Sequence, residues 1–251
     1  MGNPLSAFLK KRLLAGRRNL VSLDDPYKVM ARLLAGADVK VIVDAGASSG
    51  RLSRRFLRLF PGAGVYAFEP QPLYEATLKD LAARCNRFHP QFCALSDGEG
   101  TAALHITDLP GSTSLLAPNE RLLELAPQGS RVCRTVDVPV VTLDGWARRL
   151  ALPGVEVMKF DIQGAELKAL RGGAALLNSS TLAVYTEVLF DPLYADGAGF
   201  GELDSFLRGA GFVLYDLYGP KYDRRGMLLW ADALYLHEHR LGLSAVSRVG
   251  R

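Results

Sequence analysis

Acidic side chains follow several apolar runs of this chain, in places where an enzyme could use them. Asp44 ends the run VIVD, and Asp161 follows VEVMKF directly. Glu187 ends LAVYTE, and Asp232 lies in ADALYL. A carboxylate can accept the proton of a hydroxyl group, or bind a divalent cation that lowers the pKa of that hydroxyl. We expect Asp161 and Glu187 to be catalytic. Spacing alone does not decide whether a cation such as Mg²⁺ binds here; its candidate ligands are Asp161, Glu187 and Asp232.

A loop of small residues follows the first acid, in the stretch DAGASSG. Gly46 and Gly50 allow close backbone approach, and Ala47 and Ser48 keep the loop surface low. A helix after this loop would turn its free N–H groups toward a ligand. The stretch lacks both the full GxGxxG pattern and GxxxxGK[ST], which disfavours a dinucleotide and excludes a P-loop. An acid directly before the loop, at Asp44, favours a cationic ligand group such as the ammonium of an amino acid.

Two further strand ends add to this site. Glu69 lies in FEP, where a carboxylate can accept both hydroxyls of a ribose, and Pro70 follows it. Ala94 and Leu95 lie in CALSD, where small apolar groups could flank an adenine. Ammonium, ribose diol and adenine together describe S-adenosyl-L-methionine. We expect Asp161, besides its catalytic role, to contact this cofactor as well. Alternatively, Asp44 caps a helix and Glu69 is a solvated strand end. We favour the cofactor because the three signals occur at successive strand ends.

The elements that must position these residues alternate between strand and helix. From residue 39, the runs VKVIVD, VYAF, RFHPQFCAL, VEVMKF and LAVYTE predict strands, and segments with helical spacing separate most of them. This alternation predicts an α/β fold with a mostly parallel twisted sheet and helices on both faces. FVLYDLY and ADALYLH follow one another without a helix, which predicts a terminal antiparallel hairpin. Ligands of such sheets lie beyond the carboxyl ends of the strands.

The motifs resemble, in order, those of the FkbM-type methyltransferases. The segments are VIVDAGASSG, YAFEPQP, CALSDGEGTAAL, GSTSLL, VTLDGW, MKFDIQGAELKALRGG, TEVLFDPLY and ADALYL, and KFDIQGAE is the most specific. The resemblance implies a Rossmann-like class I methyltransferase fold and S-adenosylmethionine-dependent O-methylation of a sugar or another small hydroxyl-bearing metabolite. The chain departs from the family's common DVGAN at Ala45 and Ser48. Trp230 replaces a common glutamine, which puts the acceptor pocket in question.

We expect three parts in the chain: a helical N-terminal appendage over residues 1–38, a methyltransferase domain over 39–240 and a flexible basic tail over 241–251. A basic amphipathic segment at 4–18 belongs to the first part. Residues 96–142 break the alternation and predict an insertion over the site. Ser112, Thr113 and Ser114 in this insertion would close over the cofactor.

Other side chains near the predicted site carry weaker expectations. Lys159 lies two residues before Asp161 and should pair with an acid there, whereas His237 and His239 are expected at the surface. An aromatic wall for the acceptor could come from Tyr194, Phe200, Tyr218, Tyr222 and Trp230.

Composition limits the protein class and its partners. The 251 residues carry a net charge of +4, and no apolar run approaches the length of a membrane span. Three cysteines without CxxC spacing suggest reduced thiols, so we expect a cytoplasmic protein. The expected partner is a small hydroxyl acceptor such as a sugar, a glycolipid or a polyketide-like metabolite. Nucleic acid is disfavoured because basic and aromatic residues do not interleave. The sequence leaves open whether the chain forms a homo-oligomer.

Two other functions remain open from the sequence. A ribose 2′-O-methyltransferase acting on RNA fits the pI of about 9.0. A non-catalytic methyltransferase-like module could bind a partner through its basic N-terminal segment. Amino methylation of a base is disfavoured because DIQG stands where [ND]PP[YFW] would be needed.

Overall fold

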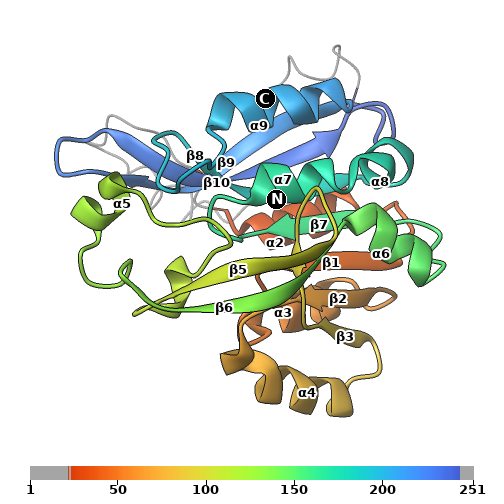
Figure 1. Ribbon diagram of the computed structural model, residues 1–251. Helices are drawn as coiled ribbons and strands as arrows, with labels where there is room; N and C mark the ends of the chain where they lie inside the picture. The colour runs from red at the N-terminus through yellow and green to blue at the C-terminus, as the bar shows by residue number, and fades with distance from the viewer. Residues whose placement is uncertain (1–21, 23, 244–251) are drawn as a thin grey trace, which may run out of the picture.

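A computed structural model describes Ser22 and residues 24–243 of the chain (Figure 1). The amphipathic segment predicted at 4–18 and most of the predicted basic tail lie outside these residues. No helix in the described part is long and apolar enough to cross a membrane. The division of the chain into three parts stays a prediction.

The described residues form a seven-stranded main sheet with the order β3-β2-β1-β7-β8-β10-β9. Neighbouring strands from β3 to β8 run parallel, whereas β10 is antiparallel to both β8 and β9. This confirms the predicted mostly parallel sheet with a terminal antiparallel hairpin. The strands are β1 (Val41–Ala45), β2 (Gly64–Phe68), β3 (Phe88–Gln91), β7 (Val157–Phe160), β8 (Ala183–Leu189), β9 (Phe212–Tyr222) and β10 (Leu228–His237).

Helices cover both faces of the main sheet, as the alternation predicts. On β1, Ile42 packs with one core and Val43 with the other, because successive side chains of a strand point to opposite faces. The first core contains residues of α2 (Pro26–Leu33), α3 (Arg51–Leu59) and α4 (Glu75–Arg84). The second contains residues of α6 (Leu143–Arg149), α7 (Glu166–Arg171), α8 (Ala174–Ser179) and α9 (Phe200–Gly209).

The predicted strand over residues 87–95 is wrong as a single strand. The chain leaves the main sheet after Gln91, and Ala94–Leu95 forms β4 in a second sheet. Pro90 lacks a backbone N–H, so it suits the edge position that β3 holds in the main sheet. Ala94 and Leu95 then find their hydrogen-bonding partners on β6 instead.

The second sheet has the order β4-β6-β5 and contains the two strands predicted within residues 96–142. β5 (Gly100–Thr107) and β6 (Val132–Val141) are antiparallel, and β4 pairs in parallel with β6. The short helices η2 (Pro110–Ser112) and α5 (Glu120–Leu125) lie between β5 and β6 in the chain. Figure 1 shows α5 near the end of the main sheet that carries the loop after β8 and the turn between β9 and β10.

Candidate functional site

A cavity of about 670 Å³ lies at the carboxyl ends of the parallel strands. One part of its wall comes from β1, β2 and β4, and we name it the glycine-loop half. The other part comes from β7, β8, β10 and α5, and we name it the acid half. The glycine-loop half includes Gly46, Ala47, Ser48, Glu69, Pro70, Ala94 and Leu95. The acid half includes Asp161, Gln163, Glu187, Asp232, Leu122, Leu189, Leu193, Tyr194, Lys221 and Trp230.

Gly46 brings the end of β1 against the end of β7. Its φ is +74°, and a Cβ built on it would lie 1.9 Å from the carbonyl oxygen of Asp161. No side chain fits there, so the glycine is needed for contact between two strand ends. The backbone N–H groups of Gly46 and Ala47 both donate to the Phe68 carbonyl, at 3.0 and 3.1 Å. The loop is therefore fixed to β7 and β2 at once.

Gly50, expected at the ligand, does not line the cavity. It stands before α3 with a φ of +72°, and a Cβ there would lie 2.9 Å from Leu81 Cδ2. Leu78 Cδ2 would lie only slightly farther away, at 3.2 Å. The missing side chain of Gly50 thus allows α3 and α4 to pack closely, and the predicted ligand contact of Gly50 stays a prediction.

Asp44, expected to hold a ligand ammonium, lies beneath the cavity wall and not in it. Its side chain is fully buried, with Ser53 Oγ donating to Oδ2 at 2.5 Å and Lys159 Nζ lying 3.2 Å from Oδ1. Lys159 Nζ also donates to the carbonyls of Ala45 and Gly46, both at 3.0 Å. Asp44 therefore anchors the lysine that supports the glycine loop, and its predicted contact with a ligand ammonium stays a prediction.

Lys159 is a buried cation enclosed by carboxylates. Burial alone lowers its pKa, but the charges of Asp44 and Asp161 outweigh burial, so the pKa of Lys159 lies above its ordinary value. Its distance to Asp161 Oδ2 is 3.9 Å, longer than its distance to Asp44. The predicted pairing of Lys159 with an acid is confirmed, although the shorter pair is with Asp44.

Glu69 lines the glycine-loop half with its carboxylate fixed on both oxygens. Oε2 accepts the Ser48 N–H at 2.8 Å, and Oε1 accepts the Gln71 N–H at 2.9 Å. Burial raises the pKa of Glu69, and these two bonds together with Lys159 oppose the rise. Each carboxylate oxygen can accept a further hydrogen bond, so Glu69 can still bind two ligand hydroxyls.

Asp161 and Glu187 meet through the amide of Gln163. Gln163 Nε2 donates to Asp161 Oδ1 at 2.8 Å and to Glu187 Oε2 at 3.3 Å. The Tyr194 hydroxyl donates to Gln163 Oε1 at 2.7 Å, which fixes the orientation of the amide. Gln163 has a φ of +59°, which is unusual for a residue with a side chain. The sequence does not predict this bridge, because Gly164 after Gln163 indicates a turn but not the contact of Gln163 with Tyr194 and Glu187.

The two bridged acids differ in their surroundings. The side chain of Asp161 is 45% exposed, whereas burial and the charges of Asp161, Glu166 and Asp232 raise the pKa of Glu187 well above its ordinary value. Asp232 lies opposite Glu187 on β10 and accepts the Tyr185 hydroxyl at 3.0 Å. An exposed carboxylate beside one whose pKa is raised is a common division between base and acid.

The candidate metal ligands do not form a metal site. Within the described residues, no three His, Cys, Asp or Glu side chains are grouped so that they could hold a metal ion. Gln163 occupies the space between Asp161 and Glu187, and Asp232 is turned to Tyr185. The geometry therefore does not support the divalent cation that the sequence leaves open.

The predicted aromatic wall is only partly present. Tyr194 and Trp230 line the cavity, whereas Phe200 stacks on Phe190 at 4.8 Å and Tyr222 is exposed. Tyr218 lines a second cavity of about 810 Å³, which adjoins the first at Arg51, Asp161 and Asp232.

Two other predictions about side chains near the site have different outcomes. His237, expected at the surface, is 7% exposed and packs edge-on against Phe212 at 5.1 Å. Burial lowers the pKa of His237, and the residue does not line the cavity. Ser112, Thr113 and Ser114 do line the cavity, and Ser114 Oγ donates to the Gln163 carbonyl at 2.7 Å.

Glu166 makes the stability of the fold depend on pH. It is 3% exposed, its Oε1 accepts the Ile162 N–H at 2.8 Å, and burial raises its pKa from 4.5 to about 7. Between these two values the native state binds more protons than the unfolded state, so the free energy of unfolding falls as pH rises. We expect this fall to be on the order of 1–3 kcal/mol.

Urea unfolding of the wild type and of Glu166→Gln at several pH values measures this contribution. The glutamine keeps a hydrogen-bond acceptor but cannot ionise, so the difference in stability between the two proteins should grow in favour of Glu166→Gln as pH rises. Parallel stability curves across this pH range would contradict the assignment.

The chain has relatives among known proteins. Residues 44–214 match the family model described as Methyltransferase FkbM domain. The chain is similar to 2-O-methyltransferase NoeI of Sinorhizobium fredii, with 31% identity over 161 residues that cover 61% of this chain and 65% of that protein. It is also similar to Methyltransferase sdnD of Sordaria araneosa, with 31% identity over 153 residues that cover 52% of this chain and 59% of that protein. The chain thus matches less than two thirds of the length of either relative.

A solved structure shares the fold. The chain is similar to Methyltransferase FkbM from Methylobacillus flagellatus KT, with a TM-score of 0.51 and 16% identity over 85% of this chain and 48% of that one. At this identity the likeness concerns the fold, and it agrees with the Rossmann-like class I architecture of the main sheet. Because the family model matches well over half of its residues, the chain belongs to the family of methyltransferase FkbM domains.

Proposed function

We propose that this chain is an S-adenosylmethionine-dependent O-methyltransferase that acts on a hydroxyl group of a sugar or another small metabolite. One observation carries the proposal: a single cavity contains both Glu69 and the Asp161–Gln163–Glu187 network. The first suits a ribose diol, and the second can receive a proton from an alcohol.

The glycine-loop half fits the proposed cofactor in its chemistry. Glu69 has spare acceptor capacity for the two ribose hydroxyls, and Pro70, Ala94 and Leu95 offer a small apolar wall for the adenine. A 2′-phosphate would be repelled by Glu69, which disfavours NADP. When bound, the cofactor supplies an electrophilic methyl group on a sulfonium.

The acid half would hold and deprotonate the acceptor. Asp161 Oδ2 lies free of Gln163, so it can accept the hydroxyl proton while Oδ1 stays fixed by the amide. Glu187, with its raised pKa, can keep a proton and donate a hydrogen bond to a second hydroxyl of the acceptor. Leu189, Leu193 and Trp230 add apolar wall that excludes water from the reaction.

A small neutral acceptor suits this half better than RNA. Asp161, Glu187 and Asp232 line it, against the cations of Lys221 and Arg51. The exposed carboxylate of Asp161, which is the proposed base, would repel a phosphate close to the reacting oxygen, whereas sugar hydroxyls can donate to it and to Asp232. The name of the relative 2-O-methyltransferase NoeI also favours an oxygen acceptor.

Glu69→Ala should weaken binding of S-adenosylhomocysteine by about 1.5–3 kcal/mol, because charge-assisted hydrogen bonds to the ribose are lost. Glu69→Gln, which keeps one carbonyl oxygen, should lose less. Calorimetric titration measures both. Glu75→Ala, which removes an exposed carboxylate paired with Lys79, is the control and should bind as the wild type does. Equal affinities in all four proteins would remove Glu69 from the cofactor site.

Methyl transfer tests the function itself. The protein would be incubated with methyl-labelled S-adenosylmethionine and a panel of methyl hexosides and 6-deoxyhexosides, and products would be identified by mass and by the carbon shift of the new methyl group. We expect a methyl group on oxygen. Transfer to nitrogen or carbon would overturn the proposal. Preferential methylation of RNA, with binding that weakens steeply in salt, would favour the ribose 2′-O alternative instead.

A further inference from the structure

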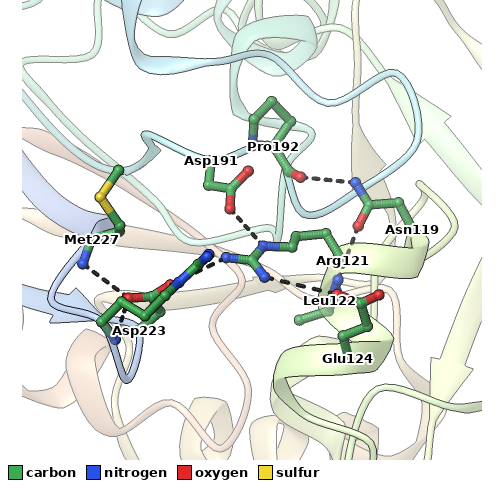
Figure 2. Close-up of polar contacts among 9 residues, drawn as sticks. Asn119, Arg121, Leu122, Glu124, Asp191, Pro192, Asp223 and Met227 are labelled. Carbon is green, nitrogen blue, oxygen red and sulfur yellow. Dashed lines mark hydrogen bonds and ion pairs between the residues drawn. The ribbon is translucent and has the colours of Figure 1, made fainter.

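Arg121 on α5 joins three segments that are far apart in the sequence, as Figure 2 shows. Its Nε donates to Asp191 Oδ2 at 2.8 Å, in the loop after β8. Its Nη2 reaches Asp223 Oδ2 at 3.5 Å, in the turn between β9 and β10. A longer contact of 3.8 Å joins Nη1 to Glu124 on the same helix. One guanidinium thus connects α5 with two loops of the main sheet.

The carboxylate of Asp223 is buried and held in place for its contact with this guanidinium. Its side chain is only 5% exposed, and Oδ1 accepts the N–H groups of Arg225 at 2.8 Å and Met227 at 2.9 Å. These backbone bonds, with the nearby arginine Arg225, hold the pKa of Asp223 below its ordinary value. Asp223 therefore stays charged and fixes the shape of the turn, leaving Oδ2 to receive Arg121 and Arg225.

The segment before α5 is tied to the same loop by backbone contacts. The N–H of Asn119 donates to the Leu193 carbonyl at 3.1 Å, and the N–H of Ala195 donates to the Ala117 carbonyl at 2.8 Å. Asn119 Nδ2 donates to the Pro192 carbonyl at 2.8 Å (Figure 2). These contacts reach the loop after β8 but not the turn between β9 and β10. Arg121 supplies the contact to that turn.

The residues next to these contacts line the acid half of the cavity. Leu122 and Ala126 follow Arg121 in the chain, Leu193 lies beside Asp191, and Lys221 and Trp230 flank the turn at Asp223. Leu122 and Leu193 belong to one apolar cluster, against which Trp230 packs. The ion pairs of Arg121 join α5 to the two loops that carry these lining residues.

We propose that Arg121 is a positioning residue, a latch that holds α5 across the acid half and thereby controls acceptor access and fit. What the acid half binds rests on the proposed function, whereas the latch itself can be tested without turnover. The side chains of Arg121 and Asp191 are 30% and 36% exposed, so their ion pair is weak and sensitive to salt, and the contact of Arg121 with the buried carboxylate of Asp223 is long at 3.5 Å. A weak latch suits a cover that must open for the acceptor and the product.

Hydrogen exchange of the full chain tests the latch in the wild type, Arg121→Ala, Arg121→Lys and Asp223→Asn. We expect peptides over 115–126 and 221–229 to exchange at least about tenfold faster in Arg121→Ala, with partial rescue in Arg121→Lys. High salt should speed exchange of these peptides in the wild type and have little effect in Arg121→Ala. Arg84→Ala, which breaks an exposed pair with Asp80, is the matched control and should leave both peptides unchanged.

Binding and kinetics separate the latch from the cofactor site. The Kd for S-adenosylhomocysteine should stay within about twofold in Arg121→Ala, and the KM of any acceptor found in the methyl-transfer assay should rise about tenfold with a smaller change in kcat. Unchanged exchange in both peptides, or equal acceleration across the whole chain, would overturn the latch. A wild type that shows the latch but binds no S-adenosylhomocysteine would instead overturn the proposed function.

Discussion

Asp161→Asn is expected to lower kcat by about 10²–10⁴-fold, the usual effect of losing a general base. The asparagine has the same shape and can still accept from Gln163 Nε2, so the network should keep its geometry. What it loses is the ability to take the acceptor proton. Since the Asp161 side chain is 45% exposed, the fold should tolerate the change. Steady-state rates with a turned-over acceptor measure the effect.

Two variants serve as controls for this result. Glu187→Gln should reduce kcat by less, because in the proposal Glu187 holds a proton and does not accept one. Asp80→Asn, an exposed carboxylate outside the cavity, should be neutral. If Asp161→Asn retained its rate while Glu187→Gln lost it, the two roles would be reversed. If neither lost activity, the base would lie elsewhere.

Lys159→Met is expected to destabilise the fold by about 3–5 kcal/mol. The Lys159 side chain is 2% exposed, and its ammonium faces the fully buried Asp44. Among the described residues Asp44 Oδ1 has no hydrogen bond, so the ion pair is the contact that stabilises this oxygen. Removing the cation leaves an uncompensated buried charge. Urea unfolding with linear extrapolation measures the loss.

The double variant Asp44→Asn with Lys159→Met distinguishes charge from packing. With both charges removed, most of the lost stability should return, because a neutral pair of similar volume avoids the desolvation penalty. Lys79→Met, at a lysine whose side chain is 62% exposed beside Glu75, should change stability by less than about 1 kcal/mol. Additive losses in the double variant would contradict a direct coupling between Asp44 and Lys159.

The sequence predicts the main sheet well because local patterns show where strands and helices alternate along the chain. Strands buried on both faces are continuous apolar runs, and the helices between them have periodic apolar residues, so the alternation is visible without contacts. The split at Gln91 was not visible, since it depends on β6, which lies about forty residues later in the chain and supplies the partners of Ala94 and Leu95.

The site is predicted less well because its contacts depend on register. Asp44 and Lys159 are direct partners across β1 and β7, and no spacing in the chain indicates that register. Asp44, which the sequence suggests as the partner of a ligand ammonium, is therefore paired with Lys159. Gly50 illustrates the same point, because the sequence indicates a close approach there but does not indicate that Leu81 of α4 is the side chain that comes close.

Calorimetric titration of the protein with S-adenosylhomocysteine, with NAD as the control, tests the central claim most directly. The account predicts one binding site with a Kd on the order of 1–100 µM and no heat of binding from NAD. Absence of any S-adenosylhomocysteine binding, in protein shown by circular dichroism and cooperative unfolding to be folded, would contradict the proposed methyltransferase activity.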